Sequence, residues 1–196
     1  CDMALSHYLE VHGDVPRGSL VAYMPVNVRT EEEDGDGNLV TLLQVKLAST
    51  HRDPLSSLDE VSESIASARE VFSGATRSAV QYYSLLVALM SLFEEVLKLG
   101  RLMPPVNNLV ISNVPGSRVR RYFKGAEAIA LYPVSTLPPM TALNVTCCSF
   151  AGTIYFGLIA GRTAVPDLPL LADYLDQAFD QLAEATGVAE PQRKAG

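Results

Sequence analysis

The chain has no tryptophan, three cysteines and three histidines among its 196 residues. Cys147 and Cys148 are adjacent, so the cysteines do not form the framework of a small disulfide-rich secreted domain, and we expect a reducing cytosol. A surplus of basic residues is also missing. The 15 Lys and Arg stand against 22 Asp and Glu, and the net charge of −7 argues against a general nucleic-acid-binding protein.

The apolar run that most resembles a membrane-spanning helix, Ala79 to Phe93, is too short to be one. A spanning helix needs roughly 20 apolar residues, and Gln81, Ser84 and Ser91 interrupt this run. We expect a helix from about 78 to 99 that is largely buried, with a membrane-surface helix as the alternative.

Signatures of catalytic chemistry are scarce as well. The chain has no Gly-x-Ser-x-Gly elbow, no phosphate loop and no dinucleotide fingerprint. His7 and His12 do not share a helix face for a metal ion, and neither they nor His51 has a carboxylate spaced as an acid–base pair. The two adjacent cysteines lie in an apolar strand, where inert thiols are expected. We therefore expect no metal site and no catalytic centre in this chain alone.

What the chain does contain is a clear order of secondary structure. The pattern predicts a helix over 2–12, strands over 19–29 and 39–49, helices over 53–72 and 78–99, strands over 108–114, 126–136, 142–150 and 153–161, and a helix over 166–187. Gly13 can end the first helix, Asp53 can cap the second, and Ala151-Gly152 can form a hairpin. Pro25 indicates a bulge or an edge strand. The order predicts an α/β sandwich, a mixed β-sheet flanked by helices.

The strand predicted over 108–114 ends in polar residues. Its apolar run, 109–111, is followed by Ser112 and Asn113, and then by Pro115 and Gly116, which supply a turn with glycine free to adopt positive φ. A strand end is where a scaffold presents polar groups to a ligand. These residues are therefore candidates for a binding site, with Asn113 as a cap of its own turn as the alternative.

A basic stretch follows this turn. It contains Arg118, Arg120, Arg121 and Lys124, with the aromatic residues Tyr122 and Phe123 between them. One interpretation is a solvated loop, and the other is an anion site or a contact with anionic lipid.

Four segments occur in a recognisable order: CDMALSHYLEVHG, NNLVISNVPGS, RRYFKGAEAIALYPVST and ALNVTCCSFAGTIYFGLIAG. In this order they resemble the C-terminal part of the bacterial wax ester synthase/diacylglycerol acyltransferase family. The resemblance covers nearly the whole chain and implies the C-terminal half of a chloramphenicol acetyltransferase-like, two-lobed fold with a tunnel between the lobes. Residues 1–186 would form that lobe, and residues 187–196 a frayed tail.

The resemblance also implies where the chemistry lies. Family members are CoA-dependent acyltransferases, and their catalytic histidine belongs to a His-His-x-x-x-Asp-Gly motif in the N-terminal half. No His-His pair occurs in this sequence. We therefore expect the chain to be a piece of a longer protein, with no catalytic residue of its own and with the N-terminal lobe as its partner. Near-continuous apolar strands over 109–160 predict an apolar surface that meets this lobe.

Site residues follow from the same resemblance. Substrate binding or tunnel support is expected from Asp2, Ser112, Asn113, Pro115, Gly116, Tyr132, Ser135 and Asn144. Asp2 matches the aspartate of the family's Asn-Asp pair, although Cys1 stands where the asparagine would be. The implied reaction esterifies diacylglycerol or a long-chain alcohol to give triacylglycerol, wax esters or both. Acyl-CoA is a substrate, and no bound cofactor is expected.

Two alternative functions stay open. One is a condensation-type acyltransferase that uses carrier-protein thioesters, and the other is a non-catalytic lipid-binding or interaction module. The expected location is cytoplasmic, with peripheral contact to the inner membrane or lipid inclusions through Arg118, Arg120, Arg121 and Lys124.

Overall fold

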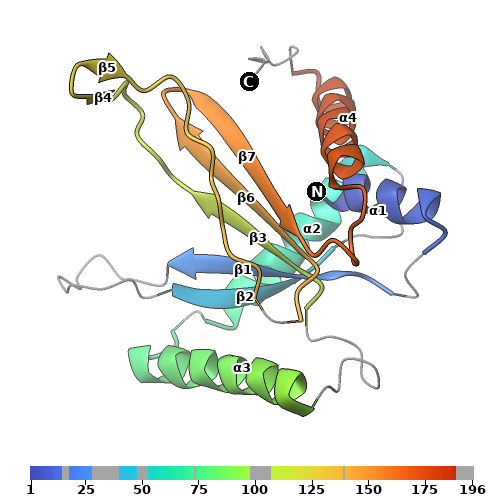
Figure 1. Cartoon of the computed structure of the whole chain (residues 1–196). Helices are drawn as coiled ribbons and strands as arrows, with labels where there is room; N and C mark the ends of the chain where they lie inside the picture. Colours follow the sequence, from blue (N-terminus) through green and yellow to red (C-terminus); the bar gives the residue numbers. More distant parts are fainter. Residues whose placement is uncertain are drawn as a thin grey trace. The chain divides into compact units, whose positions relative to one another are not determined.

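A computed structural model of the chain describes residues 1–14, 18–27, 40–47, 53–72, 74–97, 107–138 and 140–188. His51 and the expected tail from 189 onward lie outside these residues. The elements are α1 (Asp2–Val11), β1 (Val21–Asn27), β2 (Val40–Lys46), α2 (Pro54–Glu70), α3 (Arg77–Leu97), β3 (Leu109–Val114), β4 (Tyr122–Phe123), β5 (Ala126–Glu127), β6 (Leu143–Phe150), β7 (Thr153–Ala160) and α4 (Leu168–Thr186) (Figure 1). The mixture of helices and strands confirms the predicted α/β class.

The chain divides into two compact units. One unit consists of Cys1–Leu20, Lys46–Ser67 and Asp167–Gly196, and it holds α1, most of α2 and α4. The other consists of Val21–Val45 and Ala68–Pro166, and it holds the sheet and α3. Each unit is therefore made from segments far apart in the sequence.

The main sheet has five strands in the order β2-β1-β3-β6-β7. β1, β3 and β6 are parallel to one another, and β7 runs antiparallel to β6. Ala151 and Gly152 join these last two strands with φ angles of 48° and 83°, which confirms the predicted hairpin. β1 lies between β2 and β3 in the sheet, so Pro25 is not in an edge strand, and the predicted bulge stays a prediction. The residue follows the paired positions Ala22 and Tyr23.

The predicted strand over 126–136 is correct only at Ala126–Glu127. Residues 128–137 form no ladder and run as an extended segment, here called the strap. Side chains and close contacts of β6 and β7 hold it: the Tyr155 hydroxyl donates to the Ile129 carbonyl oxygen at 3.2 Å, and Asn144 donates to Thr136. Alternation along the strap is real, but its partners are side chains rather than a neighbouring backbone, and Pro133 has no N–H to offer a ladder.

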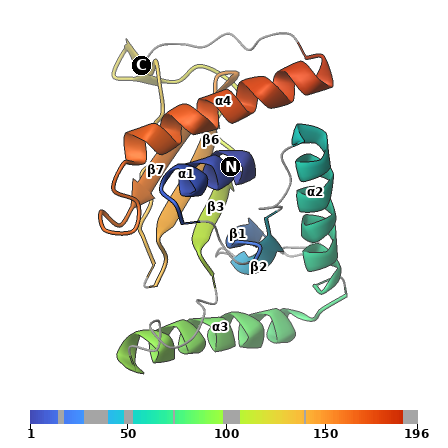
Figure 2. The ribbon, with the colours of Figure 1, turned by 90° about the vertical axis from the view of Figure 1, so that its right-hand side faces the viewer.

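The predicted helix boundaries rest on visible capping contacts. Asp53 accepts hydrogen bonds from the Ser56 backbone N–H at 2.9 Å and the Ser56 hydroxyl at 2.7 Å, as a capping side chain should. Gly13 follows the end of α1 with a φ of 70°, which only glycine adopts readily. Figure 2 shows α1 alongside α4, and the two helices contact each other within their unit.

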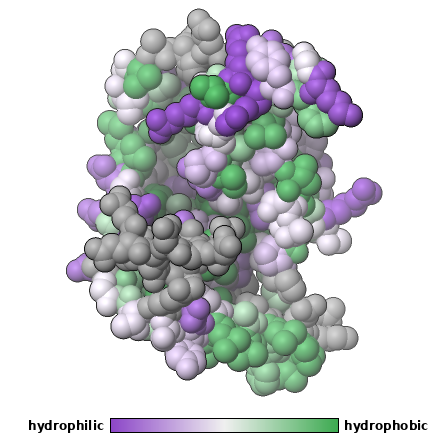
Figure 3. All heavy atoms as spheres, turned by 90° about the vertical axis from the view of Figure 1, so that its left-hand side faces the viewer, coloured by the Kyte–Doolittle hydropathy of each residue, from purple (hydrophilic) through white to green (hydrophobic). Residues whose placement is uncertain are grey.

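The burial predicted for α3 is wrong. Val80 is buried, but the large apolar residues that follow are mostly exposed, among them Leu85 at 55% and Phe93 at 61%. In Figure 3 they form a hydrophobic area at the lower edge of the view. No helix within the described ranges is long and apolar enough to cross a bilayer. The predicted helical period is correct, whereas the predicted covering of its apolar side is not.

Candidate functional site

The predicted site lies where β3 and β6 end. Because these strands are parallel, their carboxyl ends meet at one edge of the sheet. The register pairs Ser112 with Thr146, Asn113 with Cys147, and Val114 with Cys148. Side chains at paired positions share a face, and consecutive residues alternate between faces. Ser112 and Asn113 are therefore neighbours in sequence that point to opposite sides of the sheet.

On one face, Asn113 lies beside the Cys147 thiol. The Cys147 Sγ–H lies 3.4 Å from the Asn113 Oδ1 and 3.5 Å from the Ser112 carbonyl oxygen. Burial raises the pKa of the Cys147 thiol, which keeps it protonated and able to donate. Phe156 of β7 continues this row across the sheet and is 44% exposed. This face thus combines an exposed carboxamide with accessible apolar surface.

The opposite face carries a buried polar network under the strap. Asn144, which is 3% exposed, donates to the Ser135 hydroxyl at 3.1 Å and to the Thr136 carbonyl oxygen at 3.0 Å. The Thr146 hydroxyl donates to the Asn144 Oδ1 at 2.8 Å. Asn144 and Ser135, both predicted as tunnel residues, are thus engaged in holding the strap against the sheet. In this structure their side chains hold the strap.

The Pro115-Gly116 turn is held by β6. The Gly116 N–H donates to the Ser149 hydroxyl at 3.1 Å. A Cβ at Gly116 would lie 2.0 Å from the Ser149 carbonyl oxygen, and the residue does not have a positive φ. The freedom of glycine to adopt positive φ is therefore not used at this turn. Glycine is required here because the turn approaches the neighbouring strand too closely for a side chain.

Two further predicted residues, Tyr132 and Asp2, belong to other elements of the chain. Tyr132 projects from the strap, 59% exposed, with its ring 5.3 Å from that of Tyr155 in an edge-on arrangement. Asp2, 8% exposed, is in the first turn of α1, where the helix N-terminus stabilises a carboxylate. The structure brings together Ser112, Asn113, Pro115 and Gly116 at the strand end, whereas Asp2 belongs to the other compact unit.

The basic stretch forms a short hairpin of β4 and β5, here called the basic hairpin (residues 118–127). Lys124 and Gly125 make its turn with φ angles of 48° and 86°. Arg120 forms an ion pair with Glu127 at 2.7 Å, and the Arg121 Nε donates to the Ser117 hydroxyl at 2.9 Å. The apolar rings between the charges stay accessible: Tyr122 is 64% exposed and Phe123 76%. The hairpin is thus a structured, amphipathic tip rather than an irregular loop.

The histidines in the described residues are occupied by structural contacts. His7 packs edge-on against Tyr174, with ring centroids 4.3 Å apart. The His12 Nδ1–H donates to the Tyr8 carbonyl oxygen at 2.8 Å, and Nε2 lies 3.2 Å from the Asp167 carboxylate. Both ring nitrogens of His12 are therefore in contact with groups of its own compact unit. The backbone hydrogen bond to Tyr8, followed by the one to Asp167, raises the pKa of His12.

We expect His12→Gln to be most destabilising at acidic pH. A raised pKa in the folded state means that the stabilisation is fully present below the unfolded value of about 6.5 and is lost as pH rises through the folded pKa. The urea midpoints of wild type and His12→Gln should therefore differ at pH 5.5 and converge at pH 8.5. His7→Gln is the matched control, because the His7 ring packs on Tyr174 and does not bridge two acceptors. A difference that grows with pH would contradict the prediction.

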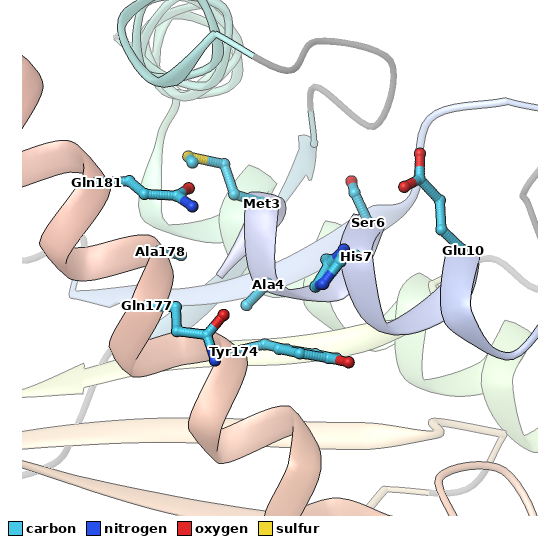
Figure 4. Close-up of a pocket in the computed structure, with 9 residues that line it drawn as sticks. All are labelled: Met3, Ala4, Ser6, His7, Glu10, Tyr174, Gln177, Ala178 and Gln181. Carbon is cyan, nitrogen blue, oxygen red and sulfur yellow. The ribbon is translucent and has the colours of Figure 1, made fainter.

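A feature that sequence reasoning missed is a cavity between α1 and α4, of about 290 Å³. Ser6, His7 and Glu10 of α1 line it together with Tyr174 and Gln177 of α4, and Figure 4 shows His7 beside Tyr174. It forms because two helices from opposite ends of the chain pack side by side, and local sequence patterns do not predict such a contact. The part of the chain that the structure describes contains no cluster of three His, Cys, Asp or Glu residues that could hold a metal ion.

Comparisons with known proteins point in one direction. A family model described as the WS/DGAT C-terminal domain matches residues 36–183. A putative diacylglycerol O-acyltransferase of Mycobacterium tuberculosis is 38% identical over 190 residues, covering 94% of this chain and 38% of that protein. The O-acyltransferase WSD of Acinetobacter baylyi is 33% identical over 180 residues, covering 90% of this chain and 38% of that protein.

Among solved structures, the wax ester synthase/diacylglycerol acyltransferase from Marinobacter aquaeolei VT8 is similar, with a TM-score of 0.79 and 28% sequence identity. The match covers 95% of this chain and 42% of that one. The chain therefore spans about two fifths of the length of these relatives.

Proposed function

Because this chain belongs to the WS/DGAT C-terminal domain family, we propose that it is the C-terminal lobe of an acyl-CoA-dependent O-acyltransferase. The proposed enzyme esterifies diacylglycerol, long-chain alcohols or both. The observation that carries the proposal is the family match over 36–183, joined to relatives named as diacylglycerol O-acyltransferase and O-acyltransferase WSD. Long-chain acyl-CoA is then the acyl donor, and the product is triacylglycerol or a wax ester.

An N-terminal lobe is the proposed partner. The chain spans 38% of the length of the mycobacterial relative, which leaves room for a lobe of at least equal size. The accessible apolar residues at the sheet edge support such a contact: Val114 is 48% exposed and Ile154 61%. We assign the general base to that lobe, since His7 and His12 are tied to contacts within this chain.

The residues of this chain would orient the substrate and stabilise the negative charge that develops during the reaction. A hydroxyl that attacks a thioester needs a base to take its proton and hydrogen-bond donors near the oxygen on which negative charge develops. The exposed Asn113 carboxamide can supply such a donor. Its Oδ1 accepts from the Cys147 thiol, which leaves the Nδ2 amide group to donate. Phe156, in the same row, offers apolar surface for an acyl chain.

The direct test is an assay of the full-length protein with a long-chain acyl-CoA. Diacylglycerol and a long-chain alcohol are supplied separately, and CoA release and ester formation are measured. We expect CoA release that depends on at least one of these acceptors. Reaction with an acyl-carrier-protein thioester alone would establish the condensation-type alternative, and lipid binding without turnover would establish the non-catalytic one.

We expect Asn113→Ala to lower kcat by about 100-fold or more, within the range of about 10²–10³ seen when an oxyanion donor is removed. Its effect on the urea midpoint should be small, because the side chain is exposed and surface substitutions usually change stability by less than about 0.5 kcal/mol. Ser112→Ala removes a polar group from the opposite face at the same strand end, so comparing the two variants shows which face contributes to kcat. Proportionate losses of kcat and stability in Asn113→Ala would reduce the residue to a turn cap.

The basic hairpin is the proposed contact with anionic groups. Its exposed rings at Tyr122 and Phe123, beside Arg118 and Lys124, have the combination of apolar and basic groups that a peripheral lipid contact needs. Headgroups of anionic lipid and the phosphates of CoA share this chemistry. Retention of vesicle binding with loss of activity, after the arginines are replaced by serine, would identify the CoA phosphates.

A further inference from the structure

α3 presents two dissimilar faces. The face that contacts strand β2 is partly polar. The Tyr83 hydroxyl donates to the Leu42 carbonyl oxygen at 3.5 Å, and the Ser84 and Thr41 hydroxyls are 3.3 Å apart. The side chains that point away are apolar, and each is about half or more exposed. They are Tyr82, Leu85, Leu86, Leu89, Met90, Leu92, Phe93, Val96 and Leu97. We call these nine residues the α3 seam.

The spacing of the α3 seam is that of a helix-pairing surface. Tyr82, Leu85, Leu89, Leu92 and Val96 follow one another at alternating intervals of three and four residues. This is the a/d pattern through which two helices interlock their side chains.

Seven of the nine seam residues are also placed symmetrically about Leu89, whereas Met90 and Leu97 have Ala88 and Gln81 at the mirrored positions. Positions seven residues to either side hold Tyr82 and Val96, positions four to either side hold Leu85 and Phe93, and positions three to either side hold Leu86 and Leu92. A two-fold, antiparallel contact requires this symmetry, because each residue of one copy must meet the mirror-placed residue of the other. We propose that two copies of this chain pair through the α3 seam, antiparallel, with the two-fold axis at Leu89.

Charge and area favour a second copy over a lipid surface. No Lys or Arg occurs between Arg77 and Lys98, whereas helices that lie on anionic membranes carry cations on their polar face. The nine seam residues, 49–73% exposed, present on the order of 1,000 Å² of mainly apolar surface, above the ~800 Å² that each partner buries in a stable interface. An uncharged seam of this size suits an equally uncharged partner, and an identical helix is one.

Cross-linking the full-length protein tests the geometry. Single cysteines are introduced by Leu89→Cys, Tyr82→Cys and Val96→Cys, and each protein is treated with a short bis-maleimide. We expect Leu89→Cys to give a covalent dimer on its own, since residue 89 faces its own copy. Tyr82→Cys and Val96→Cys should each fail alone, because identical positions then lie about 21 Å apart, and should cross-link when the two variants are mixed.

Ser84→Cys, on the inner face of the same helix, is the matched control and should give no dimer, as should the unsubstituted protein, which retains Cys1, Cys147 and Cys148. In sedimentation velocity, Leu89→Glu should raise the dimer dissociation constant about thirtyfold or more. The proposal is overturned by a monomeric wild type, by cross-linking of Tyr82→Cys alone, by cross-linking only on vesicles, or by failure of maleimide to reach the thiol that Leu89→Cys introduces.

Discussion

Gly157→Ala is expected to lower the free energy of unfolding by about 3 kcal/mol. A Cβ on Gly157 would lie 1.9 Å from the Pro133 carbonyl oxygen and 3.0 Å from its carbonyl carbon. Both atoms are backbone, so no side-chain rotation relieves the overlap, and either the strap or β7 must shift. Urea denaturation of the full-length protein measures the loss of unfolding free energy, and hydrogen exchange of the β7 amides shows whether that strand is the part destabilised.

Gly161→Ala is the control for this variant. Gly161 follows β7 directly, has no positive φ, and a Cβ there meets nothing closer than Ala164 at 3.9 Å. The two substitutions remove the same backbone freedom from the unfolded chain, so their difference isolates the contact with the strap. Equal urea midpoints for the two variants would mean that the strap does not lie this close to β7.

Asn144→Ala is expected to cost a similar amount, about 3 kcal/mol, for a different reason. The carboxamide satisfies the Thr146 hydroxyl, the Ser135 hydroxyl and the Thr136 carbonyl oxygen in a buried place. Alanine leaves these groups without their partner, and each buried polar group left unsatisfied costs about 1–3 kcal/mol, part of which an entering water molecule can recover. The loss should be seen in the urea midpoint and in faster proteolysis within 128–137.

The contrast with Asn113 makes this prediction specific. Asn113 lies in a strand of the same sheet, but its side chain is exposed and contacts a thiol. Its replacement by alanine should leave the strap protected from protease. Comparable proteolysis of the two variants would show that the Asn144 network does not anchor the strap.

Much of the fold could be predicted because it depends on local rules. Gly13, Asp53 and the Ala151-Gly152 turn act on their immediate neighbours, and each does what its residue type predicts. The strap could not be predicted as such. Its alternation of inward and outward residues is that of a strand, whereas its anchors are side chains of β6 and β7 that come later in the sequence.

The site shows the same division. The polar end of β3 is evident from sequence because an apolar run stops there. The two-residue period of a strand also implies that Ser112 and Asn113 lie on opposite faces. The need for glycine at 116 and 157 depends on distances to Ser149 and Pro133, which only the folded structure supplies. The burial of α3 could not be predicted from sequence. An apolar helix face indicates that some apolar surface should cover it, but it does not indicate which surface does so.

The strap divides its residues by task in a way that leaves room for evolutionary change. What holds it are backbone carbonyl oxygens and a few inward side chains, while Ile129 and Val134, 85% and 88% exposed, contribute no side chain to the anchoring contacts. Outward positions can therefore be exchanged without altering the attachment. A protein of this kind can acquire new surface chemistry beside a fixed sheet, at the cost of one or two substitutions, while its core sequence stays under constraint.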